Sequence, residues 1–404
     1  MFKHELMKDN FTKSDIDLVI KFLKTKKILT QSTNVLKFEK AWSKWLGVKY
    51  SVFVNSGSSA NLLLIESLLR GTRKYKFLKP GDEVIVPALA WPTTIWPIVQ
   101  LGLKPVFVDS NFEDLSIDFK KAKKAITKKT KAVFLIHVLG NSANMDLAKN
   151  FCKRYKLELL EDCCESLGAF YKKQHVGNFG LGGTFSFYFA HHICSIEGGA
   201  ICTNNKALFE DLKSFRAHGW IRNRSDKKKF IKKNKNLDEN FLFVTTGYNV
   251  RPTELNAAIA IKQLKKLEDN LKKRDSIVKK VIKIIKEFKD LKIIGEEKIS
   301  KNIFNKNSRV HSWMNLPILY TKKSQKKFKK ILKIFKKNKI ETRAIIAGNL
   351  IKHPVMKNID FKISGDLKVS EQIFKYGFMI GCHPNINLQA IQSLKKAIKE
   401  SNKI

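Results

Sequence analysis

Between residues 50 and 205, short apolar or β-branched runs alternate with longer segments of mixed polarity. Each apolar run has the length of a buried strand, and each intervening segment can hold a crossover helix. The strands predicted in this way are 84–86, 105–108, 132–136, 157–160 and 184–187. This alternation is typical of an α/β domain with a mostly parallel, doubly wound sheet.

Polar residues follow the ends of several predicted strands. Asp109, His137 and Asp162 come just past the ends of three predicted strands. The segment 186–192 begins at the end of the last predicted strand. Open α/β sheets bind ligands in the crevice at the carboxyl ends of their strands. We therefore predict a site at this edge of the sheet.

From residue 253 onward the apolar positions recur at a helical period, which predicts a long helix. A second unit follows, with a strand at 313–319, a lysine-rich amphipathic helix at 325–339 and a closing helix at 388–401. The predicted organisation is a large domain at 1–255 with an N-terminal helical segment, a connecting helix at 256–290 and a small α/β C-terminal domain at 291–404.

Composition adds one unusual feature, which is charge. The 404 residues are 43% hydrophobic, which excludes general disorder, and 78 Lys and Arg face 36 Asp and Glu for a formal net charge of +42. Such a balance fits either a polyanion-binding protein or a surface rich in lysine. Most of the basic residues are lysines spread along the whole chain, often at polar positions of helical patterns, which favours the second interpretation.

The six cysteines form no zinc-binding pattern, so no metal is predicted. The first residues lack the apolar core of a signal peptide, and no apolar run reaches the length of a membrane span. We expect a cytoplasmic protein with reduced cysteines and no membrane span.

The first candidate motif is the turn at 54–61, which contains Gly57, Ser58 and Ser59 and opens an apolar helix. The free N–H groups and the dipole at the start of such a helix favour an anion. A serine-rich helix cap without a ligand is the structural alternative.

Two further motifs carry ionisable groups. Asp162 follows an apolar strand, where a buried carboxylate needs a cationic or hydrogen-bonding partner or else caps the next helix. His191 and His192 lie in an otherwise apolar run, and imidazole suits proton transfer at neutral pH. Packing in the core is the alternative for both histidines.

The order of these pieces resembles the sugar aminotransferase family of nucleotide-sugar biosynthesis, the DegT/DnrJ/StrS family. The matching motifs are GSSAN at 57–61, Trp91, EDCCESLGA at 161–169, SFYFAHH at 186–192 and TGYNVRPTE at 246–254. The resemblance implies a fold-type I, aspartate aminotransferase-like α/β structure that binds pyridoxal 5'-phosphate or pyridoxamine 5'-phosphate in its large domain.

The family's phosphate-binding positions map to Gly57, Ser58, Ser59 and Ser186. The resemblance thus turns the anion site at the helix start into a site for the cofactor phosphate.

The remaining cofactor contacts map to four other positions. Trp91 would stack on the ring, Asp162 would pair with the ring nitrogen, and Glu165 occupies the place near the ring oxygen. Asn249 matches an asparagine that reaches the partner's cofactor, which implies a homodimer with shared sites.

The chain departs from the family at one decisive position, because His191 stands where the family has its Schiff-base lysine. Imidazole cannot form that covalent bond, so ordinary transamination is disfavoured. This feature resembles the sugar 3-dehydratase subgroup. Its iron–sulfur type is excluded because Cys194, Cys202 and the distant Cys382 cannot supply four ligands, which leaves the cluster-free GDP-sugar type.

The resemblance implies C3 deoxygenation of a nucleotide-linked 4-keto-6-deoxyhexose in deoxysugar and O-antigen biosynthesis, with His191 as the proton-transfer group and glutamate as a candidate amino donor. An aminotransferase of the same family and a non-catalytic, lysine-rich polyanion-binding relative are the alternatives. His192, His311 and Arg343 are candidate substrate contacts, each with a structural role as its alternative.

Overall fold

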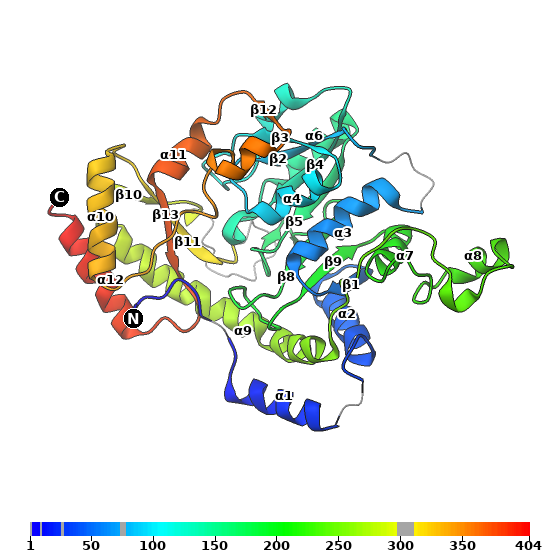
Figure 1. Ribbon diagram of the computed structural model, residues 1–404. Coiled ribbons are helices and arrows are strands. Elements are labelled where there is room, and N and C mark those ends of the chain that lie inside the picture. The colour runs from blue at the N-terminus through cyan, green and yellow to red at the C-terminus, as the bar shows by residue number, and fades with distance from the viewer. Residues whose placement is uncertain (1, 9, 26–27, 73–77, 297–310) are drawn as a thin grey trace.

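The computed structural model describes residues 2–8, 10–25, 28–72, 78–296 and 311–404. An eight-stranded sheet forms its centre, in the order β1-β9-β8-β5-β4-β2-β3-β12 (Figure 1). All neighbouring pairs from β8 to β12 are parallel, while β9 is antiparallel to both β1 and β8. The predicted α/β fold with a mostly parallel sheet is confirmed, although β1 and β9 were not among the predicted strands.

The strands of this sheet are β1 (Tyr50–Val54), β2 (Glu83–Pro87), β3 (Lys104–Val108), β4 (Thr130–Ile136), β5 (Glu158–Asp162), β8 (Gly182–Ser186), β9 (Gly199–Thr203) and β12 (Lys362–Ser364). A separate ribbon pairs β6 (Phe170–Tyr171) with β7 (Gln174–His175).

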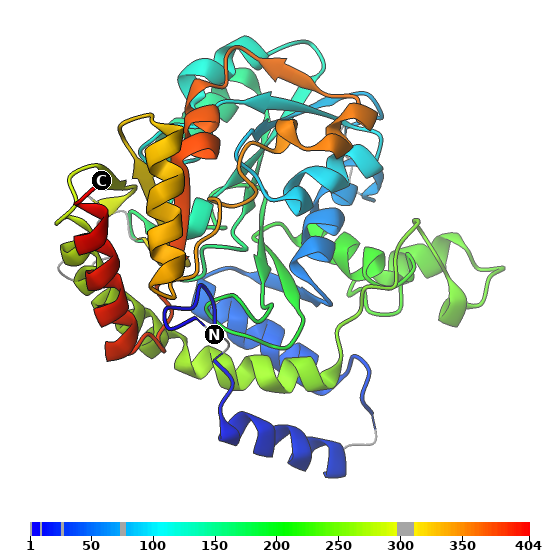
Figure 2. The same ribbon diagram turned by 60° about the vertical axis from the view of Figure 1, so that its left-hand side comes forward.

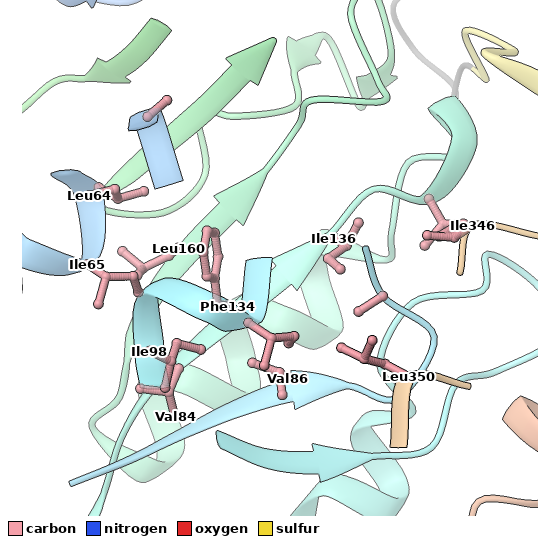
Figure 3. Packing of buried hydrophobic residues seen from close by; sticks show 14 of the residues in the cluster. Leu64, Ile65, Val84, Val86, Ile98, Phe134, Ile136, Leu160, Ile346 and Leu350 are labelled. Carbon is pink, nitrogen blue, oxygen red and sulfur yellow. The ribbon is translucent and has the colours of Figure 1, made fainter. Parts of the chain in front are cut away.

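Alternate side chains of each central strand pack on opposite faces of the sheet. On β2, Val84 and Val86 join the cluster beneath α3 (Gly57–Arg70), α4 (Pro92–Gln100) and α7 (Lys206–Phe215), where Phe134 and Leu160 also pack (Figure 3). Ile85 instead faces α5 (Phe119–Ala122) and α6 (Met145–Tyr155). Both faces are covered, which explains why these strands read as continuous apolar runs.

Two helices cover the β1 end of the second face. α2 (Thr33–Leu46) and the long α9 (Glu254–Ile285) pack together over an aromatic cluster that includes Phe53 and Phe185. α1 (Lys13–Thr25) lies outside them, against α9 (Figures 1 and 2).

The smaller unit is a three-stranded antiparallel sheet, β10-β11-β13, with helices against it. Its elements are β10 (Leu291–Ile293), β11 (Asn315–Tyr320), α10 (Gln325–Lys337), α11 (Lys368–Tyr376), β13 (Gly377–Gly381) and α12 (Leu388–Ser401).

The chain crosses the predicted boundary at residue 291 in both directions. β12 comes from the C-terminal part but adds the edge strand beside β3 in the large sheet. The N-terminal segment joins the small unit, where His4 pairs with Ile340 and its Nε2 donates to the Gly381 carbonyl at 2.8 Å. The two units are therefore joined by β12, which adds to the large sheet, and by the N-terminal segment, which contacts the small unit.

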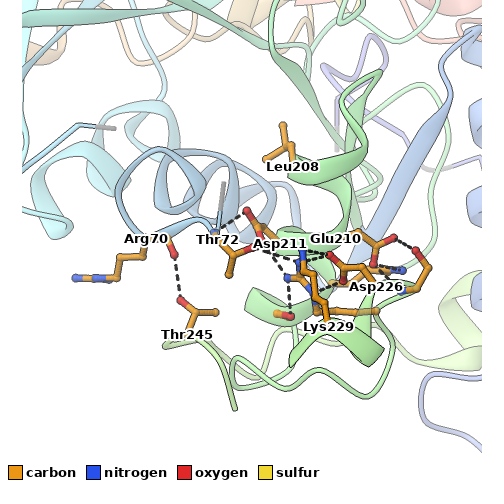
Figure 4. Close-up of polar contacts among 12 residues, drawn as sticks. Arg70, Thr72, Leu208, Glu210, Asp211, Asp226, Lys229 and Thr245 are labelled. Carbon is orange, nitrogen blue, oxygen red and sulfur yellow. Dashed lines mark hydrogen bonds and ion pairs between the residues drawn. The ribbon is translucent and has the colours of Figure 1, made fainter. Parts of the chain in front are cut away.

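Residues 216–250 form an excursion that carries the projecting α8 (Lys227–Lys233) (Figure 2). Buried Arg224 anchors this excursion, because its guanidinium donates to Asp211 at 3.0 Å and to Asp226 at 2.7 Å. Thr72, which follows α3, also donates to Asp211 (Figure 4). These hydrogen bonds attach the excursion to the body of the large unit. Asn249 lies at the far end of the same excursion.

Candidate functional site

A cavity of about 530 Å³ opens at the carboxyl ends of the parallel strands, between the large sheet and the small unit. Eight of the residues predicted from the sequence lie on its wall, namely Gly57, Ser58, Trp91, Asp162, Glu165, Ser186, His191 and Arg343. The small unit contributes Met314, Asn315 and Met379. Residues as far apart in the chain as Met7 and Met379 thus share one pocket, as expected for the crevice of an open α/β sheet.

The start of α3 forms one wall. Ser56 is its N-cap, with a side chain that accepts from Ser59 N at 3.1 Å, while Ser58 is exposed on the cavity side. A Cβ on Gly57 would lie 2.6 Å from the Cβ of Ser186, so only glycine lets the helix start approach the end of β8 this closely. Hydroxyls and helix N–H groups are thereby gathered at one point, which suits a phosphate.

Ser59 differs from its neighbours, because it is not part of the described cavity wall. Its backbone N–H is used by the Ser56 cap, and its hydroxyl accepts from that of Ser56 at 3.1 Å. Ser58 therefore lines the cavity, whereas Ser59 does not.

Asp162, at the end of β5, is held by donors from two helices. Its Oδ2 accepts from Asn61 Nδ2 at 2.8 Å and from Thr94 Oγ1 at 2.7 Å, and its Oδ1 accepts from Cys164 N at 3.0 Å. Thr184 Oγ1 donates to Asn61 Oδ1 at 2.6 Å and so orients the amide. The network fixes the orientation of a carboxylate that is 4% exposed and faces the cavity.

Asn61, Thr94 and Thr184 were missed as site residues in the sequence. Asn61 lies within the GSSAN motif, so its position was noted without a role. Thr94 and Thr184 carried no signal of their own, because a threonine in a helix or a buried strand is ordinary.

Trp91 lies at the mouth of the cavity with 44% of its surface exposed. It follows β2 and precedes the Pro92 that begins α4, which fixes where the indole is presented. The Arg343 guanidinium lies 5.9 Å from the centre of its ring, within the range of a cation–π contact. The small unit thus covers the indole with a cation.

Glu165 lies half-buried on the cavity wall, where its Oε2 accepts from Leu139 N at 2.8 Å. Burial raises the pKa of its carboxyl to about 7, with the Asp162 charge adding to the rise and the Leu139 bond and Arg343 opposing it. Glu165 can therefore hold or release a proton near neutral pH.

His191 follows β8 and lies half-buried on the wall. Burial and, second, the charge of Arg274 lower the pKa of its imidazole to about 4, so the ring is neutral at pH 7. Its buried Nδ1 has no hydrogen-bond partner among the described residues. No lysine is among the described residues that line the cavity, and this neutral imidazole is suited to act as a base there.

The structure brings neither His192 nor His311 to the described cavity wall. His192 is 1% exposed, and its Nε2 donates to the Ser312 carbonyl at 2.9 Å. His311 is 3% exposed and stacks on Trp313 with ring centres 3.5 Å apart. Both contacts indicate structural roles, in contrast to the substrate contacts expected from the sequence, whereas Arg343 does lie on the wall.

Asn249 also lies away from the cavity wall of its own chain. It is exposed, lies at the end of the excursion 216–250, and its Oδ1 accepts from Arg251 Nε at 2.9 Å.

A buried trio, His137, Glu161 and Cys163, brings potential metal ligands within 4.8 Å of one another. Hydrogen bonds already occupy these groups. The Glu161 carboxylate accepts from the backbone N–H groups of Gly177, Phe179 and Gly180, and His137 Nδ1 accepts from Ala143 N. The hydrogen bond between His137 and Glu161 therefore connects the end of β4 to β5, which indicates a structural role for the trio.

Comparison with known proteins gives consistent results. GDP-4-keto-6-deoxy-D-mannose 3-dehydratase from Yersinia pseudotuberculosis is 38% identical over 378 residues, which are 92% of this chain and 92% of the relative. A solved structure of a GDP-4-keto-6-deoxymannose-3-dehydratase mutant with bound GDP-perosamine superposes with a TM-score of 0.88 at 34% identity, over 98% of this chain and 100% of that chain.

A second structure of a GDP-4-keto-6-deoxymannose-3-dehydratase, with a trapped PLP-glutamate geminal diamine, has a TM-score of 0.87 at 33% identity, again over 98% and 100% of the two chains. These superpositions confirm the predicted fold class. The model of the DegT/DnrJ/EryC1/StrS aminotransferase family matches residues 9–399. Motifs, fold and sequence thus agree, and the chain belongs to the DegT/DnrJ/EryC1/StrS aminotransferase family.

Proposed function

We propose that this protein is a pyridoxal 5'-phosphate/pyridoxamine 5'-phosphate-dependent 3-dehydratase that removes the C3 hydroxyl of a GDP-linked 4-keto-6-deoxyhexose. One observation carries the proposal. A neutral His191 stands on the cavity wall at the family's lysine position, and no lysine lies among the described lining residues. The relatives named above support the reaction type and the nucleotide.

The residues present fit the cofactor. The close approach of Gly57 to Ser186 leaves a cradle that any larger side chain would fill, at the N-terminus of a helix. Asp162 offers a hydrogen-bonded carboxylate for the ring nitrogen, and Trp91 offers an aromatic face. Glu165 is placed to share a proton with an oxygen substituent of the ring.

When bound, pyridoxamine phosphate supplies an amine for the C4 ketone and a ring that withdraws electrons. Asp162 holds the proton on the ring nitrogen, and Trp91 orients the ring plane. His191 takes a proton from the C4′ carbon of the cofactor and delivers a proton to the departing C3 hydroxyl. One neutral imidazole serves both steps because it first accepts the proton that it later donates.

The products of this reaction are a 3-deoxy-4-keto sugar, ammonia and the cofactor in its oxidised, pyridoxal phosphate form. No net water is formed, because the hydrolysis steps take up the water released earlier. A new amine is then needed for each turnover. Glutamate is the proposed donor, in line with the glutamate adduct in the solved relative.

Product analysis tests the proposal. The purified protein is incubated with the cofactor, glutamate and a panel of GDP-, CDP- and dTDP-linked 4-keto-6-deoxy sugars, and the products are analysed by mass spectrometry. We expect a product that lacks the C3 oxygen, formed fastest from the GDP sugar. His191→Asn should abolish it while the cofactor remains bound.

An aminotransferase of the same family is the second candidate, and it would instead yield a sugar with an amine at C4. A non-catalytic polyanion-binding protein is disfavoured, because eight of the residues predicted from the sequence to form the site lie around one cavity.

We also propose a homodimer with shared sites. Asn249 is exposed and is not among the residues that line the cavity of its own chain, although its position matches a cofactor contact of the family. This placement is what a contact to the partner's cofactor requires.

A cytoplasmic location completes the proposal. All six cysteines are free, in keeping with a reducing compartment. No described helix is both long and apolar enough to cross a membrane.

A further inference from the structure

A buried cation lies close enough to His191 and His192 for its charge to act on both rings. Arg274, on α9, is 3% exposed, and its guanidinium makes no ion pair with any carboxylate of the described residues. Its Nη1 donates instead to the carbonyls of Trp313 at 3.0 Å and Met314 at 2.8 Å. Burying a charge without a counterion is costly, so a structural reason alone would favour an apolar residue here.

The carbonyls that Arg274 holds belong to a short segment that we call the 312–314 strap. His192 Nε2 donates to the first carbonyl of this strap, that of Ser312, at 2.9 Å. Two side chains therefore fix three successive carbonyls from one side. Trp313 has φ +52°, a left-handed conformation that a bulky residue adopts only when its surroundings impose it.

The backbone N–H groups of the strap are also held. Ser312 N donates to Gly140 O and Met314 N donates to Leu139 O, both at 2.9 Å. Leu139 N in turn donates to Glu165, and Met314 lines the cavity. Met314 of the strap therefore forms part of the cavity wall, and Arg274 and His192 hold the carbonyls of the strap.

The positive charge of Arg274 also acts on the histidines in front of it. After burial, it is the second cause of the lowered pKa of both His191 and His192. The other titratable or charged groups that share the cavity wall with His191 are Asp162, Cys164, Glu165, Tyr188, Glu197 and Arg343.

We propose that Arg274 is a positioning residue for His191, because it fixes the 312–314 strap to which the adjacent His192 is hydrogen-bonded. The charge held at this place also disfavours a second positive charge on the His191 ring. Only an unprotonated ring nitrogen can accept a proton. A ring whose pKa is lowered stays unprotonated, and therefore able to act as a base, over a wide pH range. The inference rests on the proposed function for its catalytic meaning, while the effect on His191 can be measured without turnover.

The test uses the full-length protein with and without cofactor. Histidine NMR signals are followed from pH 8 downward, with His191 assigned by comparison with H191N. In R274Q, which removes the charge, we expect the His191 midpoint to rise by about one pH unit. In R274K, which keeps the charge but loses the forked guanidinium, the midpoint should stay while kcat falls about tenfold with little change in KM.

The matched control is K273Q, which removes the same charge from an exposed neighbour on α9 and should shift nothing. The proposal is overturned if R274Q titrates like K273Q, or if R274K turns over at the wild-type rate. The R274K arm still decides if R274Q does not fold. Absence of dehydratase activity in the wild type would refute the proposed function but leave the NMR result as a test of the electrostatic role.

Discussion

Asn61 Nδ2 donates a 2.8 Å hydrogen bond to Oδ2 of Asp162, across 101 positions of sequence. The amide can point only this way, because its Oδ1 accepts from Thr184. Asn61 therefore helps to determine how Asp162 faces the cavity. Asp162 and Asn61 together form this part of the site.

Replacing Asn61 by Leu should weaken cofactor binding. A hydrogen bond to a charged group contributes about 1.5–3 kcal/mol, which corresponds to roughly a ten- to hundredfold rise in the dissociation constant. Equilibrium dialysis with cofactor absorbance measures this constant. Asn55→Ala, at an exposed position before the same helix, is the control, and equal affinities for the two variants would contradict the role of Asn61.

Borohydride reduction of the protein with pyridoxal phosphate should trap no covalent adduct in the wild type, because no lysine lies among the described lining residues. H191K should gain an adduct, which peptide mass mapping locates at position 191. A stable adduct on another lysine of the wild-type protein would refute the proposed mechanism.

Glu165 should make stability depend on pH. The pKa of its carboxyl rises from 4.5 to about 7 on folding, so the folded state binds the extra proton between these values. Stability from this group is present at low pH and is lost as pH rises through that window. E165Q, which does not titrate, should therefore gain stability over the wild type between pH 4.5 and 7, by about 3 kcal/mol at most.

Urea unfolding of the cofactor-free proteins at several pH values measures this difference. The free energy of unfolding of E165Q minus that of the wild type should grow with pH. A difference that stays constant, or that shrinks, would show that Glu165 is ionised throughout the range.

Mixed dimers test the shared site. H191N and N249A should each be inactive or strongly impaired alone. In a heterodimer, one site carries both changes and the other neither, so random mixing should restore roughly a quarter of the wild-type activity. The mixture is made by co-expression with two tags. No recovery in purified heterodimers would place Asn249 in the site of its own chain, and full activity of N249A alone would place it outside both sites.

The pattern of apolar runs was sufficient to predict the sheet, because strands buried on both faces leave a clear local signal. It failed at β1 and β9, which close the sheet at the other edge from β12. β12 was also missed, since a three-residue edge strand with two exposed positions carries little pattern. The boundary at 291 was drawn from sequence order, whereas β12 and the N-terminal segment cross it in space.

The candidate site divides in the same way. Gly57, Ser58, Trp91, Asp162, Ser186 and His191 stand in motifs that one sequence can display, and all reach the cavity wall. His192 and His311 were grouped with them by residue type, but each turns into the core. Residue type states what a side chain can do, while its direction depends on the packing of elements distant in the chain.

The sequence by itself thus determined the central parallel strands, the cofactor-binding motifs and the histidine in place of lysine, because these features are local. Only the tertiary structure decided which groups hold Asp162, that Glu165 lies where burial raises its pKa, and that Arg274 stands behind the histidine pair. Strand order and helix packing set these contacts, and they join residues that no local period relates.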